Sequence, residues 1–540
     1  MENSDDLFEQ ALSLARTGLL SEGLGCLEKM GPGALRRPEV LALKGALMTE
    51  AGSPSEAVPF FERALALDPA NATAHCNYGN ALARIKRPAD AIQAYSKALS
   101  IDHDYALALT NRAGQRLELK QYQFALEDVE RALFINPGLP SSHRTRALAL
   151  LAMRRLSDAL ASIDAAIALR DSSPAAHSDK AVILNEMGRF EESARSHAQA
   201  VACSPGDPEK TLNSALARLL IGDYRGGWID YEQRWQTPKF HKTSNMYRPD
   251  SVLPSLDLRC SSDDLVGKSV LLVNEQGIGD QLMFASMVPD LLRSAACVSW
   301  LLEPRLAGLV SNSFPQARLF PTSKGLTVDV SEFQHVIPLG SLGRLYRNRR
   351  EDFPGTPYLR PRPQVADAWR NRLGPREQPL RIGISWRGGV DHTAGARRSM
   401  PLETLKPLLA RPDCEFFSLQ YGEVEPEVAE INVGLERPIR VFPRDEIDDF
   451  EQLAGLVLAL DLVVSVQTSL IHLAGAVGAT CMVMIPFVPE WRYGASGSTM
   501  PWYDSVRLFR QGDTDDWQPI IGEISAELDR LSGGTQSARE

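Results

Sequence analysis

Cysteine is scarce in this chain and shows no functional spacing. The 540 residues include seven cysteines, which are scattered, odd in number and never arranged as CxxC. A disulfide framework needs paired cysteines, and the common structural zinc sites need clustered ones. The sequence therefore predicts neither kind of site, and it favours a reducing compartment.

An excess of positive charge is also lacking. Lys and Arg together number 58 against 68 Asp and Glu, which gives a formal net charge of −10. Proteins that bind nucleic acids need a basic surface that releases counterions from the phosphates. We therefore exclude DNA and RNA as partners.

Long apolar runs are nearly absent. The one uncharged run long enough to consider as a membrane span covers residues 470–489, LIHLAGAVGATCMVMIPFVP. His472, the glycines and Pro486 divide this run into a short helix and a strand, so we predict buried α/β core and no membrane span. The first residues, MENSDDLFEQ, lack the basic and apolar regions of an export signal, so we expect a cytoplasmic protein.

What the chain does contain is the composition of folded domains. Hydrophobic residues make up 44% of the sequence and charged residues 23%, as in soluble globular proteins. A chain of this length is too long for one compact core, so two to four domains are expected.

Residues 1–235 carry an internal repeat with a period of about 34 residues. The small residues in register at this period are Gly45, Gly79, Ala113, Ala147, Ala181 and Ala215. Pro69, Pro137 and Pro205 mark the ends of repeat units. Small residues are needed where two helices touch, and proline ends a helix. The pattern is typical of tetratricopeptide repeats, each a pair of antiparallel helices, so we predict an α solenoid over residues 1–235.

A solenoid of this kind leaves a concave groove that usually holds a peptide or another protein. Asn77, Asn80, Asn111 and Arg112 occupy helix positions that could line the groove and suit a polypeptide backbone. Two alternatives stay open. The array could serve as a spacer or dimerisation platform, and any one of these polar residues could be solvated surface.

The repeat stops at the next segment, and a second architecture follows. Residues 236–265 hold three prolines and are predicted to be a linker. Buried-strand patterns at 269–274 and 298–303 flank a helical pattern, and after the proline-rich segment 354–363 a second such series begins at Arg381. Alternating strands and helices imply parallel sheets, so we predict two Rossmann-like lobes, 266–365 and 378–532, with a cleft between them. A short tail, 533–540, is expected to be disordered.

The stretch EQGIGDQLMF, residues 275–284, lies where the first strand of the first lobe passes into a helix. Ligands bind beyond the carboxyl ends of parallel strands, and Gly277 and Gly279 would allow the backbone to turn tightly and approach a bound group. Asp280 would stand at the start of the helix, where a plain capping role is the competing interpretation. A dinucleotide fingerprint fits less well, because the third glycine is missing.

Several motifs occur in a familiar order. They are EQGIGDQLMFA, ISWRGG, RSMPLETL, FFSLQ, SVQTSLIHLAGAVGA, PEWRYG and MPWYDSVRLFRQ. Together they resemble the GT-B glycosyltransferases related to the family 9 heptosyltransferases. The chain is most similar to the bacterial subgroup in which this module is fused to tetratricopeptide repeats, a subgroup that includes flagellin glycosyltransferases. The resemblance implies an α solenoid followed by an α/β GT-B module of two lobes.

The resemblance also implies two catalytic residues. Asp280 matches the aspartate that serves as general base and removes the proton of the attacking hydroxyl. His472 matches a residue of the second lobe that could donate a hydrogen bond or positive charge to the departing oxygen. The alternative for His472 is a core histidine satisfied by a backbone carbonyl.

The implied donor-binding residues surround the same cleft. They are Gly277, Gly279, Trp386, Arg387, Arg398, Ser418, Gln420, Gln467, Thr468 and Ser469. Thr468 and Ser469 would start a helix whose free N–H groups bind phosphate, and Arg387 and Arg398 are candidate phosphate clamps, with surface arginine as the default. Relatives often carry aspartate at the position of Gln467. No DxD motif ends a strand of the first lobe, so neither a metal nor another cofactor is expected besides the nucleotide sugar.

The sequence thus predicts a cytoplasmic, metal-independent, inverting protein O-glycosyltransferase. Its repeats would hold a protein acceptor while the GT-B module moves a sugar to a serine or threonine hydroxyl. By resemblance, flagellin and a nonulosonic acid such as pseudaminic acid are the best specific acceptor and sugar, and the nucleotide (CMP, ADP, UDP or GDP) stays open. The alternatives are a non-catalytic adaptor with a degenerate GT-B lobe, and a transferase acting on a non-protein glycan.

Overall fold

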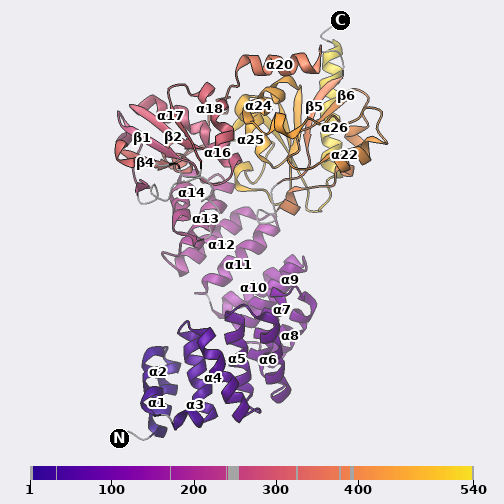
Figure 1. Cartoon of the computed structure of the whole chain (residues 1–540). Coiled ribbons are helices and arrows are strands. Elements are labelled where there is room, and N and C mark those ends of the chain that lie inside the picture. Colours follow the sequence, from indigo (N-terminus) through magenta and orange to yellow (C-terminus); the bar gives the residue numbers. More distant parts are fainter. Residues whose placement is uncertain are drawn as a thin grey trace. The chain divides into compact units, whose positions relative to one another are not determined.

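The computed structural model describes residues 4–537, apart from 32, 171, 239, 241–254, 324–325, 327, 376–378 and 389–394. The chain divides into two compact units, Met1–Met187 and Gly188–Glu540 (Figure 1). Each unit has its own helices and core. The predicted boundary at residue 235 therefore differs from the observed one.

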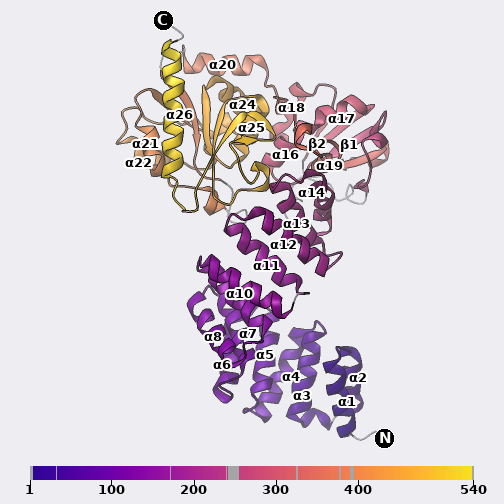
Figure 2. The same cartoon turned by 180° about the vertical axis from the view of Figure 1, so that it is seen from behind.

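The first unit is built of helix pairs. Its helices are α1 (Ser4–Arg16), α2 (Leu20–Lys29), α3 (Pro38–Glu50), α4 (Pro54–Leu67), α5 (Ala72–Arg84), α6 (Pro88–Ile101), α7 (Ala106–Glu118), α8 (Tyr122–Ile135), α9 (Pro140–Ala152), α10 (Leu156–Leu169) and α11 (Pro174–Glu186). α3 packs on α4, α5 on α6, α7 on α8 and α9 on α10, as two-helix repeats require (Figure 2). The predicted helical solenoid is confirmed.

The periodic small residues lie where the helices of a pair touch. A Cβ atom on Gly45 would meet the Phe61 ring at 2.9 Å, and one on Gly79 would meet the Tyr95 ring at 2.5 Å. Contacts that short require glycine, because an added side chain would force the helices apart. Pro69 and Pro137 follow the ends of α4 and α8, as predicted.

Three of the residues expected in the concave groove bond to neighbours within this unit. Asn111 donates its amide to Asn80 Oδ1 at 2.9 Å, and Arg112 forms an ion pair with Asp128 at 2.6 Å. Asn80 also accepts from the Tyr95 hydroxyl at 2.8 Å. The Asn111–Asn80 bond links successive repeats, and the other two bonds join the helices of one pair, so these side chains contribute to the solenoid itself.

The second unit begins with three further helices, α12 (Phe190–Cys203), α13 (Pro208–Leu220) and α14 (Tyr224–Tyr231), and the short 3-10 helix η2 (Glu232–Gln236). Trp228 of α14 is fully buried, and its ring lies 5.5 Å from the Trp491 ring and 6.1 Å from the Phe284 ring. A Cβ atom on Gly343 would meet the Trp228 indole at 2.6 Å. The last helices therefore share a core with the sheets that follow, which the repeat pattern alone does not reveal.

The first α/β region contains a four-stranded parallel sheet in the order β3-β2-β1-β4. Its elements are β1 (Ser269–Val273), α16 (Ile278–Phe284), α17 (Val288–Ser294), β2 (Cys297–Leu302), α18 (Ala307–Ser313), β3 (Arg318–Pro321), β4 (His335–Pro338) and α19 (Leu342–Tyr346). The two strands that the sequence predicts here are β1 and β2. Of the predicted linker, residues 241–254 lie outside the described part of the chain.

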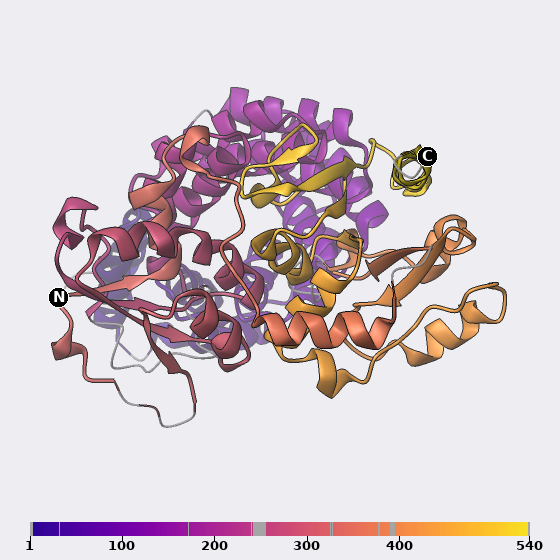
Figure 3. The ribbon, with the colours of Figure 1, turned by 90° about the horizontal axis from the view of Figure 1, so that it is seen from above.

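The second α/β region contains a six-stranded sheet in the order β6-β5-β7-β8-β10-β9, parallel except for the pair β9 and β10. The two α/β regions lie side by side (Figure 3). Its strands are β5 (Leu380–Ser385), β6 (Cys414–Ser418), β7 (Leu462–Val466), β8 (Cys481–Ile485), β9 (Thr499–Met500) and β10 (Tyr503–Arg510). Its helices are α20 (Pro363–Leu373), α21 (Lys406–Leu409), α22 (Glu425–Asn432), α23 (Arg444–Ile447), α24 (Phe450–Ala459), α25 (Ser469–Val477) and α26 (Gln518–Ser537).

Two predictions about the end of the chain can be compared with these elements. The uncharged run 470–489 forms most of α25 and all of β8, as expected for α/β core, and no described helix is long and apolar enough to cross a membrane. The tail predicted to be disordered from residue 533 instead continues α26 through Ser537, and residues 538–540 lie outside the described part. The helix continues because neither proline nor a left-handed glycine interrupts it.

Candidate active-site cleft

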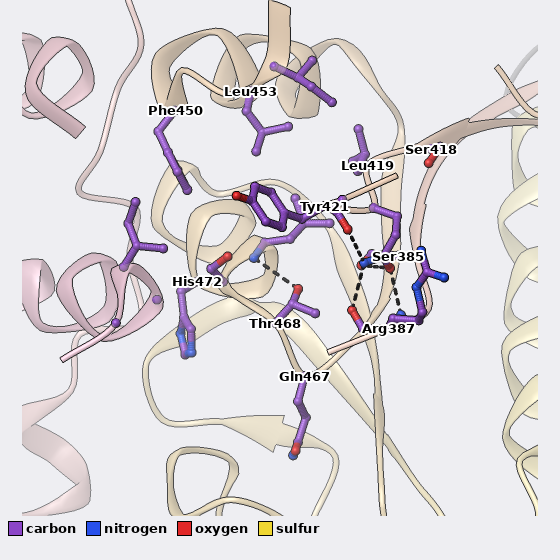
Figure 4. Close-up of a pocket in the computed structure, with 18 of the residues that line it drawn as sticks. Ser385, Arg387, Ser418, Leu419, Tyr421, Phe450, Leu453, Gln467, Thr468 and His472 are labelled. Carbon is purple, nitrogen blue, oxygen red and sulfur yellow. Dashed lines mark hydrogen bonds between the residues drawn. The ribbon is translucent and has the colours of Figure 1, made fainter. Parts of the chain in front are cut away.

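A cavity of about 830 Å³ is lined by side chains from both α/β regions of the second unit. Gly277, Gly279 and Asp280 contribute from the first region. Thr468 and His472, at the start of α25, contribute from the second (Figure 4). The predicted site residues that line it are Gly277, Gly279, Asp280, Arg387, Arg398, Ser418, Gln420, Gln467, Thr468, Ser469 and His472. Residues that are far apart in the sequence are thus brought to one cavity.

Trp386 is the predicted site residue that does not line the cavity. Its side chain is fully buried, and its indole Nε1 donates a hydrogen bond to Glu427 at 3.1 Å. The strand β5 ends at Ser385, so the next side chain turns back into the core beneath the sheet. The expected direct contact with a donor is therefore wrong for Trp386.

The glycine loop allows α16 and α25 to approach closely. A Cβ atom on Gly279 would lie 3.3 Å from His472 Cδ2 and 3.3 Å from Ser469 Cα. The expected tight turn is not made by glycine, because Gly277 has a φ of −78° and the left-handed residue is Gln276, with a φ of 60°. Gly279 is therefore needed for helix contact, and the turn itself strains a residue with a side chain.

The loop is held from outside the sheet by the end of α14 and by η2, the short helix that follows it. Arg234 of η2 donates to both oxygens of Glu275 at 2.8 Å, and both side chains are fully buried. Glu275 also accepts the backbone N–H of Gly340 at 2.6 Å. The strained Gln276 donates its amide to the Tyr231 hydroxyl. Sequence reasoning missed these partners, because no spacing rule pairs residues about 40 positions apart.

Asp280 forms an ion pair that crosses the cavity. Its Oδ1 atom accepts from Arg492 Nε at 2.8 Å and also from Arg492 Nη2. Burial raises the pKa of Asp280, while the Arg492 guanidinium opposes that rise. The capping alternative is not observed, since Gly277 is the N-cap residue of α16 and the Asp280 carboxylate bonds to Arg492.

His472 lies inside α25 with its ring at the cavity. Its Nδ1 atom lies 3.2 Å from the Tyr503 hydroxyl, and the residue is only 4% exposed. Burial, together with the nearby Arg492 charge, lowers the pKa of His472 to about 3. The ring is therefore neutral near pH 7, so the expected positive charge is wrong and hydrogen bonding is what this side chain offers. The backbone-carbonyl alternative is also not observed.

The start of α25 presents several polar groups. Thr468 is the N-cap residue and accepts the backbone N–H of Leu470 at 3.2 Å (Figure 4). Gln467 is 1% exposed, and neither atom of its amide has a hydrogen-bond partner among the described residues. The buried Ser418 hydroxyl likewise has none in that part of the chain. A buried polar group without a partner costs about 1–3 kcal/mol, so both side chains are suited to a bound polar molecule.

The arginines of the cleft are already paired. Arg387 contacts Glu427 at 2.6 Å, and Arg398 contacts Glu490 at 2.8 Å. An anion that binds either guanidinium must therefore compete with a carboxylate. Gln420 shapes this loop, because its Oε1 atom accepts from the backbone N–H groups of Trp386 and Arg387, at 2.9 and 2.8 Å.

Apolar side chains line another part of the cavity and were not predicted. Leu419, Tyr421, Phe450 and Leu453 gather on one side of it (Figure 4). Tyr421 is 66% exposed, which is unusual for a large aromatic residue. Such a wall suits a flat ring. Its residues come from separate elements, so no local sequence pattern marks them.

Comparison with known proteins covers parts of the chain. Residues 50–106 and 144–208 match the model of the tetratricopeptide repeat. Protein FlbA of Caulobacter vibrioides (strain ATCC 19089 / CIP 103742 / CB 15) is 30% identical over 350 residues, which are 60% of this chain and 56% of that protein. The chain thus spans little more than half the length of this relative.

Two solved structures of pilus-related proteins resemble part of the chain. PilW, a type IV pilus biogenesis factor, is 19% identical with a TM-score of 0.35, covering 39% of this chain and 97% of PilW. PilF of Pseudomonas aeruginosa is 20% identical with a TM-score of 0.34, covering 38% of this chain and 94% of PilF. The chain carries tetratricopeptide repeats, followed by a region with two mostly parallel sheets and a cavity lined by residues of both α/β regions.

Proposed function

We propose that the protein is a glycosyltransferase that moves a sugar from a nucleotide-activated donor to a serine or threonine hydroxyl of a protein acceptor. The observation that carries this proposal is the shared cavity of Asp280 and His472, which come from different α/β regions. A base and a leaving-group contact on opposite walls are what an inverting displacement at one carbon requires.

On the acceptor side, Asp280 receives the proton of the attacking hydroxyl. The bond to the anomeric carbon forms as that proton moves to the carboxylate. Burial raises the pKa of Asp280, which makes it a stronger base than an exposed aspartate. Arg492 opposes this rise and favours the ionised form that a base needs.

On the donor side, the leaving phosphate lies at the start of α25. The first N–H groups of this nine-residue helix have no partner within the helix and favour an anion. Ser469 and the unpartnered amide of Gln467 supply further polar contacts. Neutral His472 donates a hydrogen bond if its single proton is on Nε2, a state that the Tyr503 hydroxyl favours by donating to Nδ1.

The acceptor side of the proposal rests on the repeats. A protein bound by the unit Met1–Met187 has a raised local concentration at the cleft, so weak sequence preference at the catalytic site suffices. Flagellin as acceptor and a nonulosonic acid as sugar follow from the family resemblance and are proposals of the same kind. The apolar wall of Leu419, Phe450 and Leu453 suits the nucleobase without distinguishing its identity.

A second candidate is a non-catalytic adaptor. The observation that favours it is the pairing of Arg387, Arg398 and Arg492 with carboxylates, which leaves the cleft without an uncompensated cation among these three. In that case the repeats would still bind a protein, and the cavity would bind a ligand without transferring it.

The test is intact-mass analysis of flagellin co-expressed with the full chain in cells that make a nonulosonic-acid donor. Wild type is expected to add the sugar mass, and Asp280→Ala to reduce the modified fraction at least about 100-fold, the size of a general-base contribution. Asp367→Ala is the matched control, because this carboxylate pairs with Arg370 on the surface of α20. An unmodified acceptor with wild type overturns the transfer reaction, and equal modification by Asp280→Ala removes Asp280 from its role.

A further inference from the structure

Arg492 is the arginine of the motif PEWRYG, and the family resemblance gives it no role. It belongs to the short 3-10 helix η14 (Trp491–Tyr493), which follows β8 in the second α/β region. Its side chain is 15% exposed and contacts the carboxylate of Asp280 from the opposite wall of the cavity. We propose that Arg492 is a positioning residue that orients Asp280 for proton transfer.

The geometry of the pair supports this role. Arg492 donates through both Nε and Nη2, and both bonds go to the same oxygen, Oδ1. No donor among the described residues contacts Oδ2 of Asp280, because every hydrogen bond recorded for this carboxylate is made by Arg492 at Oδ1. Two bonds to one oxygen fix the rotation of the carboxylate and leave the other oxygen for the acceptor hydroxyl.

Arg492 is itself held in place on two sides. Its Nη1 atom contacts Glu490 at 2.7 Å, and its guanidinium lies 4.9 Å from the centre of the Trp491 ring. Trp491 packs edge-on against Trp228, which is fully buried. The guanidinium therefore has a fixed position before any substrate binds, which is what orientation of a base requires.

The same contacts connect the base to the donor side. Glu490 binds Arg492 through one oxygen and Arg398 through the other, at 2.7 and 2.8 Å. Arg398, Glu490, Arg492 and Asp280 thus form a chain of alternating charge from the proposed phosphate clamp to the base. The chain makes the orientation of Asp280 depend on groups that also face the donor.

The proposed step is balanced and rests on the proposed transfer reaction. The acceptor oxygen forms a bond to the anomeric carbon, its proton moves to Oδ2 of Asp280, and the bond from that carbon to the phosphate oxygen breaks. Arg492 gives up no proton, since its neighbours raise its pKa above the ordinary value. It touches Asp280 and, in this scheme, no reacting atom.

Several charged and titratable groups face Asp280, and they set the sign of the expected pH effect. Arg492 lowers the pKa of Asp280, while burial and the carboxylates of Glu490 and Glu275 raise it. Tyr231 and Tyr503 stay protonated, because burial raises the pKa of each phenol, and His472 is neutral. Removing the Arg492 charge must therefore raise the pKa of Asp280 further.

The experiment compares Arg492→Lys and Arg492→Gln with wild type in the full chain. Sugar transfer to flagellin is followed as a function of pH, and carbodiimide with glycinamide labels Asp280 in its protonated form, with the extent read by peptide mass spectrometry. For Arg492→Gln we expect transfer to fall about 100-fold and both the acidic limb of the rate and the labelling midpoint to move to higher pH. Arg492→Lys keeps the charge but not the fork, so we expect a rate loss with a smaller shift.

Arg507→Gln is the matched control, since this arginine pairs with Glu527 and does not line the cavity. It is expected to leave the rate, the acidic limb and the labelling midpoint unchanged. If the labelling midpoint of Asp280 does not move in folded Arg492→Gln, the inference is overturned, even when the wild type transfers sugar. A wild type that transfers no sugar overturns the proposed function instead. A shifted labelling midpoint in Arg492→Gln would then still show that Arg492 lowers the pKa of Asp280, but it would say nothing about catalysis. Should Arg492→Gln fail to fold, Glu490→Gln loosens the same guanidinium and is expected to lower transfer in the same assay; an unchanged rate would overturn the inference.

Discussion

Arg234 and Glu275 form a fully buried ion pair that ties η2 to the glycine loop of the cleft. Arg234 also donates to the Ser341 hydroxyl, and Glu275 also accepts the backbone N–H of Gly340. Both carboxylate oxygens of Glu275 are therefore hydrogen-bonded inside the protein. The proposed base lies five residues further along the chain. The relationship means that, within the second unit, η2 supports the loop that leads to the proposed base.

The first prediction concerns this pair. Arg234→Met leaves Glu275 buried without its cation, and breaking a buried pair on one side costs about 3–5 kcal/mol. We expect the free energy of unfolding of the second unit to fall by that amount in urea denaturation. Arg225→Met, an exposed position of α14, is the control and should change it by less than about 0.5 kcal/mol. Equal stability of Arg234→Met and wild type would show that the pair is not needed.

A second prediction follows from the division of the chain at residue 187. The segment 188–540 should fold as a unit, because it keeps Trp228 and Tyr231 in its core. The segment 236–540 loses both aromatic residues together with Arg234, so its core is open. We expect it to bind a hydrophobic dye and to melt without a cooperative transition in calorimetry, whereas 188–540 melts cooperatively. The opposite order would restore the boundary that the repeat period predicts.

The sequence predicts part of this architecture and misses another part. The 34-residue period predicts the helix pairs correctly, because each small residue lies at a close contact between neighbouring helices, such as Gly79 against Tyr95. The short apolar runs at 269–274 and 298–303 likewise predict β1 and β2. The period does not show where one core ends and the next begins, since α12 and α13 continue the repeat while packing with the second unit.

The same limit applies to the cleft. The motifs predict a shared site for Asp280, Thr468 and His472, because each lies beyond the carboxyl end of a parallel strand, β1 in one sheet and β7 in the other. They do not predict the partners of Arg492 and Glu275, which depend on three-dimensional packing. Nor do they predict the charge of His472, which depends on burial.

A third prediction concerns the contact between α16 and α25. Gly279→Ala adds a Cβ atom 3.3 Å from both His472 and the backbone of Ser469, so one helix must shift. Overpacking of this kind costs about 1–3 kcal/mol, which outweighs the gain in helix propensity of about 1 kcal/mol. We expect a lower melting temperature and loss of transfer. Gly512→Ala meets no atom within 4 Å and should leave both unchanged.

A fourth prediction concerns stability in acid. Burial lowers the pKa of folded His472 to about 3 from the ordinary value of 6.5, so the unfolded chain binds a proton that the folded chain does not. Stability contributed by this group is full above about pH 6.5 and falls toward pH 3, by at most about 1.4 kcal/mol per pH unit. In His472→Gln, the slope of the unfolding free energy against pH should be smaller across this range. The largest expected reduction is about 1.4 kcal/mol per pH unit, which corresponds to one proton. An unchanged slope would mean that the ring is protonated in the folded state.

The last prediction concerns Tyr503, whose hydroxyl lies between His472 Nδ1 at 3.2 Å and the Tyr358 hydroxyl at 3.3 Å. Tyr358 donates to the backbone oxygen of Leu282 at 2.7 Å, so its own proton is used. Tyr503 therefore has one proton for either neighbour, and donation to Nδ1 leaves the histidine proton on Nε2.

Tyr503→Phe removes this donor while keeping the ring in its place against Gly475. His472 is then free to carry its proton on either nitrogen, so we expect kcat for sugar transfer to fall about 10-fold or more with KM for the donor little changed. Tyr346→Phe is the matched control, because Tyr346 lies outside the cavity and bonds to none of the proposed site residues. If both variants keep the wild-type kcat, Tyr503 does not set the tautomer of His472. Another group would then have to hold the histidine proton on Nε2 for the proposed hydrogen bond to the leaving phosphate.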